Sequence, residues 1–288
     1  MEAGKGDRAA QYLVETDWLA THLDDPNLRI IDCTVFIKYK ANGGIHLESG
    51  RTAWQQGHIP GSTFVDLFEE VADRESKFHF TMPPAAQFAE AMSRHGIGEG
   101  TRVILYDGAM TIGAARLWWM LRVFGFDNAA VLNGGWKKWQ QERRPISVES
   151  DLPSPGHFIA RPCSELIASK EEVLAALADK GTCLINALSE ARYREMHIPN
   201  SVNAPAESLL NPETHVYLSL DTLHQKFEQI GATCKRVITY CDSGIWASSD
   251  AFILTLLGVE NVAVYDGSMT EWMADSTLPV EIGRSFKP

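Results

Sequence analysis

A single cysteine near the end of the chain stands where a reactive thiolate could be built. Cys241 follows a short β-branched run, residues 237–240, and precedes a segment with helical spacing. A loop that turns sharply from strand to helix converges its backbone N–H groups on its first residue, and the helix N-terminus adds partial positive charge. We therefore expect the Cys241 thiol to lose its proton more easily than a free cysteine does.

The residues after Cys241 suit such a loop. Gly244 allows backbone conformations closed to other residues, and Ser243 and Ser248 have short hydrogen-bonding side chains. The alternative is an inert core thiol, the commoner role of a free cysteine after a strand. A cysteine phosphatase is excluded, because its C-x5-R loop places an arginine where this chain has Ala247.

The chain carries one pattern twice. Residues 54–62, Trp-Gln-Gln-Gly-His-Ile-Pro-Gly-Ser, correspond to residues 193–201, Tyr-Arg-Glu-Met-His-Ile-Pro-Asn-Ser. Two further pairs of segments match in the same order, residues 102–107 with 236–241 and residues 124–135 with 257–268. In this alignment Asp107 takes the place of Cys241. We therefore interpret the chain as two copies of one domain, of which only the second carries the thiol.

Short apolar runs alternate with helical patterns in each copy. The runs expected as buried strands are residues 28–32, 103–106, 129–132, 182–186, 237–240 and 262–265. Helices are expected over residues 114–124 and, with an N-cap signal at Ser169, over residues 169–178. The alternation predicts an α/β fold of two tandem domains, residues 1–150 and 151–288, each a mainly parallel sheet flanked by helices. Ligands bind such sheets at the carboxyl ends of the strands, where Cys241 lies.

Composition limits the partners and the compartment. The formal net charge of -11 argues against nucleic acid or an anionic membrane as a partner. No apolar stretch reaches the roughly 18 residues needed to span a bilayer, and we expect a cytoplasmic protein. The five cysteines include no C-x-x-C pair, so we expect neither a disulfide framework nor a zinc site, and most of these thiols to be buried and inert.

Three motifs together closely resemble the two-domain rhodanese family, the thiosulfate and 3-mercaptopyruvate sulfurtransferases. They are the duplicated aromatic-x3-His-Ile-Pro element, the Cys241 loop and the closing segment, residues 265–272, and the resemblance covers about residues 12–282. The loop Cys-Asp-Ser-Gly-Ile-Trp-Ala-Ser is more similar to the mercaptopyruvate pattern Cys-Gly-Ser-Gly-Val-Thr-Ala-Cys than to the thiosulfate pattern, which has Arg-Lys after the cysteine. The resemblance implies a catalytically silent N-terminal domain, in agreement with Asp107 at the cysteine position.

The resemblance also implies an activity. Cys241 would take a sulfane sulfur from 3-mercaptopyruvate or thiosulfate as a persulfide and pass it to cyanide, a thiol or a thioredoxin-like protein. Attack of a thiolate on the outer sulfur splits one transfer into two displacements, and converging N–H groups stabilise the anionic persulfide without a metal or organic cofactor. The rival hypothesis is a catalytically weak rhodanese-like protein that carries sulfur or binds a partner.

Donor binding is expected to involve the loop and charged residues near it. The family's substrate-binding arginine aligns with Arg192, and Arg194 is close enough in sequence to supply a second charge. For both arginines, the alternative is a solvated position on the surface with no role in donor binding. In mercaptopyruvate-type members the histidine equivalent to His58 faces the active cysteine, whereas the alternative is a structural role in the His-Ile-Pro turn. The loop residues expected at the donor site are Asp242, Ser243, Gly244, Ile245 and Trp246.

Four residues depart from the family pattern. Leu188 replaces an arginine and Asn186 an aspartate, which removes a structural ion pair rather than the nucleophile. Asp242 places a carboxylate beside the thiol, where it opposes thiolate formation and repels the dianion thiosulfate more than mercaptopyruvate. Trp246 replaces a small or basic residue and should narrow the pocket. The tryptophan-rich segments, residues 117–120 and 136–139, are expected to pack in the core and between the domains.

Overall fold

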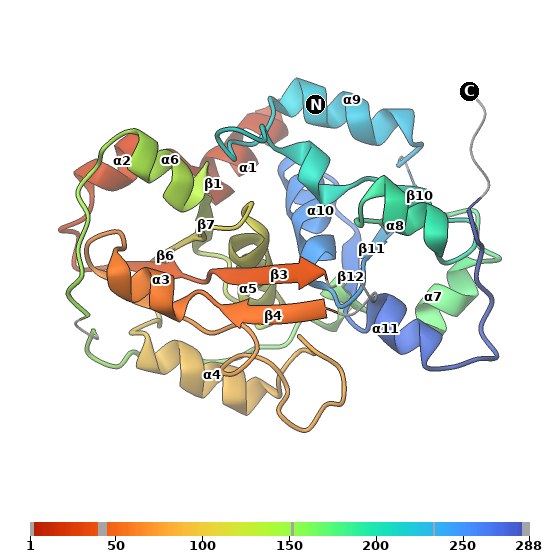
Figure 1. Cartoon of the computed structure of the whole chain (residues 1–288), viewed down its shortest axis with the longest axis horizontal. Coiled ribbons are helices and arrows are strands. Elements are labelled where there is room, and N and C mark those ends of the chain that lie inside the picture. The colour runs from red at the N-terminus through yellow and green to blue at the C-terminus, as the bar shows by residue number, and fades with distance from the viewer. Residues whose placement is uncertain (1–2, 40–44, 151–152, 233, 284–288) are drawn as a thin grey trace.

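Two α/β halves lie side by side in the computed structural model, which describes residues 3–39, 45–150, 153–232 and 234–283. Two central helices, α5 (Ile112–Val123) and α10 (Ile245–Leu256), pack against each other between the halves (Figure 1). The two helices therefore form the interface through which residues of one half reach the other.

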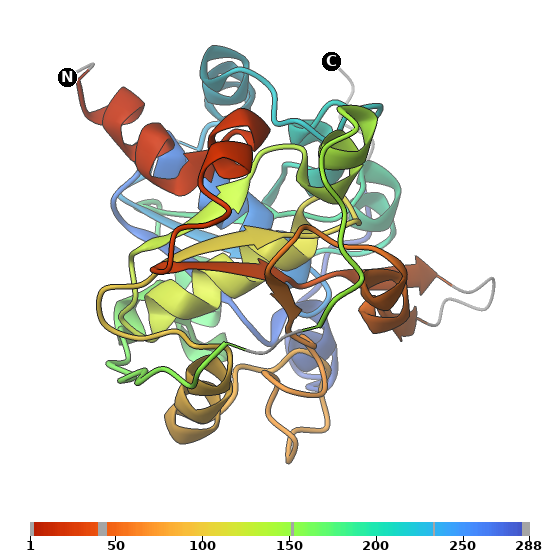
Figure 2. The ribbon, with the colours of Figure 1, turned by 90° about the vertical axis from the view of Figure 1, so that its left-hand side faces the viewer.

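The first half is built on a five-stranded parallel sheet in the order β1-β7-β6-β2-β5. Its strands are β1 (Leu13–Val14), β2 (Leu28–Asp32), β5 (Ser62–Phe64), β6 (Arg102–Tyr106) and β7 (Ala129–Leu132). Its other helices are α1 (Ala3–Tyr12), α2 (Thr16–Thr21), α3 (Arg51–Gln56), α4 (Ala85–Arg94) and α6 (Gly135–Gln141). A separate antiparallel hairpin, β3 (Val35–Tyr39) and β4 (Ile45–Ser49), projects from the body of the molecule (Figure 2). The sequence patterns did not predict this hairpin.

The second half has a parallel sheet in the order β10-β9-β11-β12-β8. Its strands are β8 (Ile167–Ala168), β9 (Thr182–Asn186), β10 (Val202–Asn203), β11 (Arg236–Tyr240) and β12 (Val262–Tyr265). Its other helices are α7 (Lys170–Ala176), α8 (Glu190–Glu195), α9 (Leu220–Gln229) and α11 (Ser268–Met273), with short 3-10 turns η1 (Ser164–Leu166) and η2 (Ala206–Leu209). Across the described residues, no helix is long and apolar enough to cross a membrane.

The two sheets have the same strand order once corresponding strands are matched. Strands β1, β7, β6, β2 and β5 correspond to β8, β12, β11, β9 and β10. Side-chain contacts repeat as well. The Tyr106 hydroxyl lies 2.9 Å from the Ser62 hydroxyl, and the Tyr240 hydroxyl lies 2.7 Å from the Ser201 hydroxyl. The predicted architecture of two tandem, mainly parallel α/β units is therefore confirmed, and all six predicted strands are present within one residue of their expected bounds.

Tryptophans fill the core of the first half and its contact with the second. Trp118 and Trp119 on α5 and Trp139 on α6 are fully buried. The Trp118 ring makes an edge contact with Phe252 of α10, with ring centroids 4.8 Å apart. One apolar cluster continues through this contact from the first half into the second, while the outer face of each sheet has a cluster of its own. Residues 117–120 thus pack in the core and between the halves as predicted, whereas residues 136–139 contribute Trp139 to the outer core cluster of the first half.

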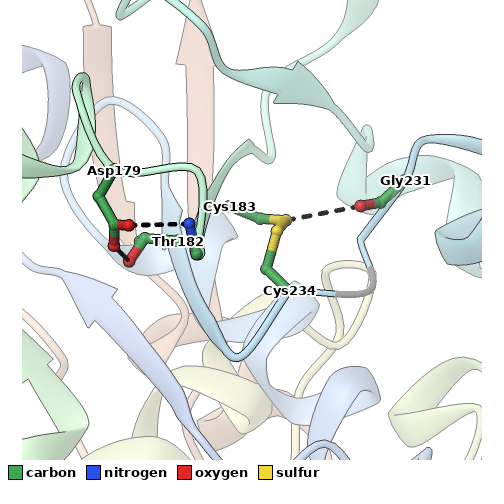
Figure 3. Close-up of a disulfide and its surroundings, with 6 residues drawn as sticks. Asp179, Thr182, Cys183, Gly231 and Cys234 are labelled. Carbon is green, nitrogen blue, oxygen red and sulfur yellow. Dashed lines mark hydrogen bonds between the residues drawn. A yellow bond between two sulfur atoms is a disulfide. The ribbon is translucent and has the colours of Figure 1, made fainter.

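One cysteine prediction is wrong, because the structure contains a disulfide between Cys183 and Cys234 (Figure 3). Cys183 lies on β9 and Cys234 lies just before β11, the neighbouring parallel strand. The strand pairing brings the two residues, 51 apart in sequence, to a Cα–Cα distance of 5.6 Å. An odd number of cysteines therefore did not exclude one bridge. Cys33, Cys163 and Cys241 are free thiols.

Candidate active site

Cys241 is the first residue after β11, and the chain turns sharply there to enter α10. Gly244 caps the N-terminus of α10 with φ 77°, a left-handed backbone conformation that favours glycine. The turn thus has the strand-to-helix form expected from the sequence. It places Cys241 at the carboxyl end of the sheet, where parallel α/β folds bind ligands.

Ser268 of α11 fixes the backbone of this loop. The backbone N–H groups of Cys241 and Gly244 both donate to its Oγ, at 3.0 and 3.2 Å. The Ser268 hydroxyl in turn donates to the carbonyl oxygen of Tyr265, at 2.7 Å. One side chain thereby holds both ends of the loop against the end of β12.

The Cys241 thiol is more basic than an ordinary cysteine, which contradicts the expectation that it loses its proton easily. Burial, and secondarily the negative charge of Asp242, raise the pKa of Cys241 to about 11. Backbone N–H groups of the loop and of the first turn of α10, those of Ala247, Ser243 and Trp246, lower this pKa without reversing it. The loop amides thus favour the thiolate, but loss of water around a fully buried thiol is the larger effect.

The equivalent loop of the first half already binds an anionic group. Asp107 stands at the cysteine position, and its carboxylate accepts N–H groups from Ala109 at 2.7 Å, Thr111 at 3.0 Å and Ala114 at 2.8 Å. The loop form after β6 and β11 can therefore surround a negatively charged side chain with backbone donors. A thiolate or a persulfide at Cys241 has the same requirement.

Arg192 reaches the Cys241 loop, as its alignment predicted, but it does so by binding Asp242. Its Nη2 lies 3.1 Å from Oδ1 and 3.4 Å from Oδ2 of that carboxylate. The N-cap Ser189 accepts the Arg192 N–H at 3.4 Å and so helps to begin α8. The Arg192 side chain is 33% exposed, so one side of the guanidinium remains within reach of solvent.

Two other predicted charged or polar contacts are not formed at the loop. Arg194 is an exposed residue that pairs with Glu190 on its own helix. His58 is fully buried, with Nδ1 2.8 Å from the Trp54 carbonyl oxygen and Nε2 2.8 Å from the Glu149 carbonyl oxygen. Its ring also stacks on Trp54, at 4.3 Å between centroids. The structure thus gives His58 the structural role in its turn rather than a place facing Cys241.

The equivalent turn of the second half has the same contacts, which supports a structural role for His58. His197 has Nδ1 2.8 Å from the Tyr193 carbonyl oxygen, and its ring stacks on Tyr193 at 3.9 Å. Each histidine therefore fixes the His-Ile-Pro turn of its own half through the aromatic residue four positions earlier.

Apolar side chains surround the thiol. Cys241, Ile245 and Leu188 belong to one buried cluster, against which the partly buried Trp246 packs. Asn186, at the family's aspartate position, accepts the Leu188 N–H at 2.9 Å. Because the Cys241 side chain has no exposed surface, a donor can reach the sulfur only after a covering side chain moves.

Ser268 was missed by the sequence analysis. The internal repeat contained a usable signal, because Ser268 aligns with Gly135, so that the hydroxyl occurs only in the copy with the thiol. Both positions have a positive φ, 50° at Ser268 and 51° at Gly135. A serine in a conformation that favours glycine is a reason to look for a contact made by its side chain.

Known proteins with similar sequences share this arrangement of two halves. The Rhodanese-like domain family matches residues 15–142 and 169–275. The 3-mercaptopyruvate sulfurtransferase of Escherichia coli (strain K12) is 32% identical over 283 residues, covering 94% of this chain and 98% of that protein. The thiosulfate sulfurtransferase of Rattus norvegicus is 31% identical over 302 residues, covering 96% and 97%.

Solved structures are similar over the same length. The crystal structure of SseA from Escherichia coli, described as a 3-mercaptopyruvate sulfotransferase with the rhodanese fold, is 30% identical, with a TM-score of 0.80 over 90% of this chain and 98% of that one. The Tum1 protein of Saccharomyces cerevisiae, 23% identical, shares the fold with a TM-score of 0.78 over 92% of this chain.

Proposed function

The chain belongs to the rhodanese family and is a sulfurtransferase, and we propose that Cys241 carries the transferred sulfur as a persulfide between an anionic donor and a nucleophilic acceptor. The observation that carries this proposal is the position of Cys241 in a strand-to-helix loop equivalent to the one whose backbone N–H groups bind the Asp107 carboxylate in the first half. Such donors stabilise the negative charge of a thiolate and then of a persulfide.

The two displacements balance in atoms and electrons. The Cys241 sulfur attacks the outer sulfur of the donor and forms an S–S bond. In 3-mercaptopyruvate the C–S bond breaks and its electron pair leaves as the enolate of pyruvate; in thiosulfate the S–S bond breaks and sulfite leaves. An acceptor thiolate or cyanide then attacks the outer sulfur of the persulfide, and the Cys241 thiolate is released.

The proton of the thiol favours mercaptopyruvate as the donor. Since the pKa of Cys241 is about 11, the resting group near neutral pH is the thiol, and its proton must depart as the new bond forms. The enolate that leaves mercaptopyruvate needs one proton to become pyruvate, so the proton lost by the Cys241 thiol can neutralise this leaving group. Thiosulfate also brings two negative charges toward Asp242, which repels a dianion more strongly than a single carboxylate.

Mass spectrometry after mixing with each donor tests the proposal directly. We expect the mass of one added sulfur atom on Cys241 with mercaptopyruvate, its removal by cyanide or a small thiol, and no addition to Cys241→Ser. Sulfur found on another cysteine, or on none, would overturn the proposal.

A second candidate function has one observation in its favour. The complete burial and raised pKa of Cys241 suit a protein that holds sulfur for a partner and reacts slowly with small molecules. Persulfide that forms on Cys241 but persists in excess cyanide, and is removed by a thioredoxin-like protein, would favour this carrier function over the enzyme.

A further inference from the structure

An arginine of the first half reaches the Cys241 loop of the second. Arg116 lies on α5 and is 1% exposed. Its Nη2 lies 2.7 Å from Oδ1 of Asp266 and donates to the Phe80 carbonyl oxygen at 2.5 Å. Arg116 Nη1 and Asp266 Oδ1 are both buried without a hydrogen-bond partner among the described residues, so the guanidinium and the carboxylate meet as an ion pair without hydrogen-bond geometry. A buried guanidinium of this kind is fixed in place by its ion pair rather than by water.

Asp266 connects this arginine to the backbone that holds the loop. It follows β12 directly and lies two residues before Ser268, whose hydroxyl binds the N–H groups of Cys241 and Gly244. Its Oδ2 accepts the Met82 N–H at 2.7 Å, a second contact from the first half. Two residues of the first half, Arg116 and Met82, therefore hold the Asp266 carboxylate.

The side chains of Arg116 and Asp266 pack against the turn at Gly244. A methyl group added to Gly244 would lie 3.0 Å from both the carbonyl oxygen and Oδ1 of Asp266, and 3.1 Å from Nη1 of Arg116. These distances leave no free space between the turn and the ion pair. A displacement of the guanidinium or of the carboxylate would therefore shift Gly244, which lies in the loop between Ser243 and Trp246, two residues whose N–H groups act on the sulfur.

We propose that Arg116 is a positioning residue for sulfur transfer. Together with Asp266, it holds the Gly244 turn in the form in which the loop amides face the sulfur. The inference rests on the proposed persulfide chemistry at Cys241. It gives the first half, which has Asp107 at the cysteine position, a part in the reaction of the second half.

The test compares variants in the full-length chain, with rates expressed per folded protein. Arg116→Met removes the charge, Arg116→Lys keeps a charge but offers only one nitrogen, and Arg116→Met/Asp266→Asn removes both partners. Arg122→Met is the matched control, because Arg122 lies on the same helix and also contacts the second half, at Thr255, away from the Cys241 loop. Sulfur loading of Cys241 is followed by mass spectrometry under single-turnover conditions, over a range of mercaptopyruvate concentrations.

Arg116→Met should load sulfur about ten- to a hundredfold more slowly at saturating donor, with the half-saturating donor concentration changed less than about twofold. Arg116→Lys should restore part of the rate. The double variant should be no slower than Arg116→Met, because the two residues act as a unit. Arg122→Met should lower thermal stability without lowering the loading rate.

A folded Arg116→Met that loads at the wild-type rate, or an Arg122→Met that loses as much, would overturn the inference. If Arg116→Met does not fold, Arg116→Lys serves as the test. Sulfur loading of Arg116→Lys at the wild-type rate would show that the guanidinium of Arg116 is not needed to position the loop. Wild-type protein that gains no sulfur on Cys241 overturns the proposed function as well, whereas normal loading in both wild type and variant overturns only the inference about Arg116.

Discussion

Arg192 of α8 and Asp242 of the Cys241 loop form an ion pair, with Nη2 of the arginine 3.1 Å from Oδ1 of the aspartate. The pair places two opposite charges beside one thiol. The carboxylate opposes ionisation of Cys241. A guanidinium paired with that carboxylate is expected to offset part of its charge. Substitution of either partner should therefore change the chemistry of the thiol and the choice of donor together.

Asp242→Gly should make Cys241 more acidic and improve the use of thiosulfate. Removal of the carboxylate takes away a charge that raises the pKa of the thiol, so the thiolate fraction at a given pH should increase about tenfold. It also leaves the Arg192 charge to attract a dianion. The rate of Cys241 alkylation against pH measures the first effect, and thiocyanate formation from each donor measures the second.

Asp242→Asn is the matched control for that substitution, because it removes the charge while keeping nearly the same volume. Both variants should respond less to added salt than the wild type when thiosulfate is the donor. A wild-type preference for thiosulfate over mercaptopyruvate, or no gain in either variant, would contradict the electrostatic argument.

Arg192→Ala should weaken donor binding and slow ionisation of the thiol. Loss of the guanidinium removes an anion-binding group from the loop and also the charge that offsets Asp242, so the pKa of Cys241 should rise above about 11. We expect the donor KM to increase about tenfold and the acceptor KM to change little. An unchanged donor KM in Arg192→Ala, combined with an increase in Arg194→Ala, would place the anion site at Arg194 instead.

Loss of the disulfide should reduce stability and leave sulfur transfer intact. The bridge between Cys183 and Cys234 closes a loop of 51 residues, which in the chain-entropy model stabilises the fold by about 4 kcal/mol. Cys183 pairs with Val237 near the amino ends of the strands, whereas Cys241 lies at their carboxyl ends. Denaturant unfolding of wild type and of Cys183→Ser/Cys234→Ser, with and without reductant, measures the effect. A variant that stays as stable as oxidised wild type would show that the bridge does not constrain the chain.

Asp250→Asn should stabilise the protein at neutral pH. Asp250 of α10 is fully buried, neither of its oxygens has a hydrogen-bond partner in the described part of the chain, and burial raises its pKa well above the usual range. A raised folded-state pKa gives stability that is complete below the unfolded-state pKa of about 4 and is lost as pH rises above it. The variant should therefore be more stable than the wild type at pH 7, where the unfolded wild-type chain is ionised and the buried carboxyl is not.

The stability gain of Asp250→Asn should shrink as the pH is lowered and disappear well below the unfolded-state pKa of about 4, where the wild-type carboxyl is protonated in both states. Urea unfolding at pH 7 and at lower pH measures the difference. Equal stability at pH 7 would mean that Asp250 has a stabilising partner in solution.

The sequence predicted the parts of this structure that depend on local pattern. Strand β6 and strand β11 were recognised because their apolar runs are continuous, as in strands buried on both faces. Helix α7 was recognised from Ser169, whose capping box with Glu172 is present. The hairpin of β3 and β4 was missed, since its pairing depends on which of two separated segments meet.

The properties of the site were harder to predict, because they depend on contacts between distant segments. The loop amides around Cys241 followed from the strand-to-helix turn. The direction of its pKa shift did not, because burial of the sulfur in a core built by many elements of the chain excludes water from it. Likewise Arg192 and Asp242 are fifty positions apart, and no local pattern shows that they touch.

The two halves are not interchangeable, because a thiol placed in the loop that holds Asp107 would lack contacts that Cys241 has. Asp107→Cys would return a thiol to a ring of amides, but Gly135 there lacks the hydroxyl that Ser268 supplies. The helical position nine residues after the loop's first residue is Arg116 in one copy and Asp250 in the other. The two halves therefore differ at several positions of the same loop and helix, so Asp107→Cys alone would not reproduce the Cys241 site in the first half.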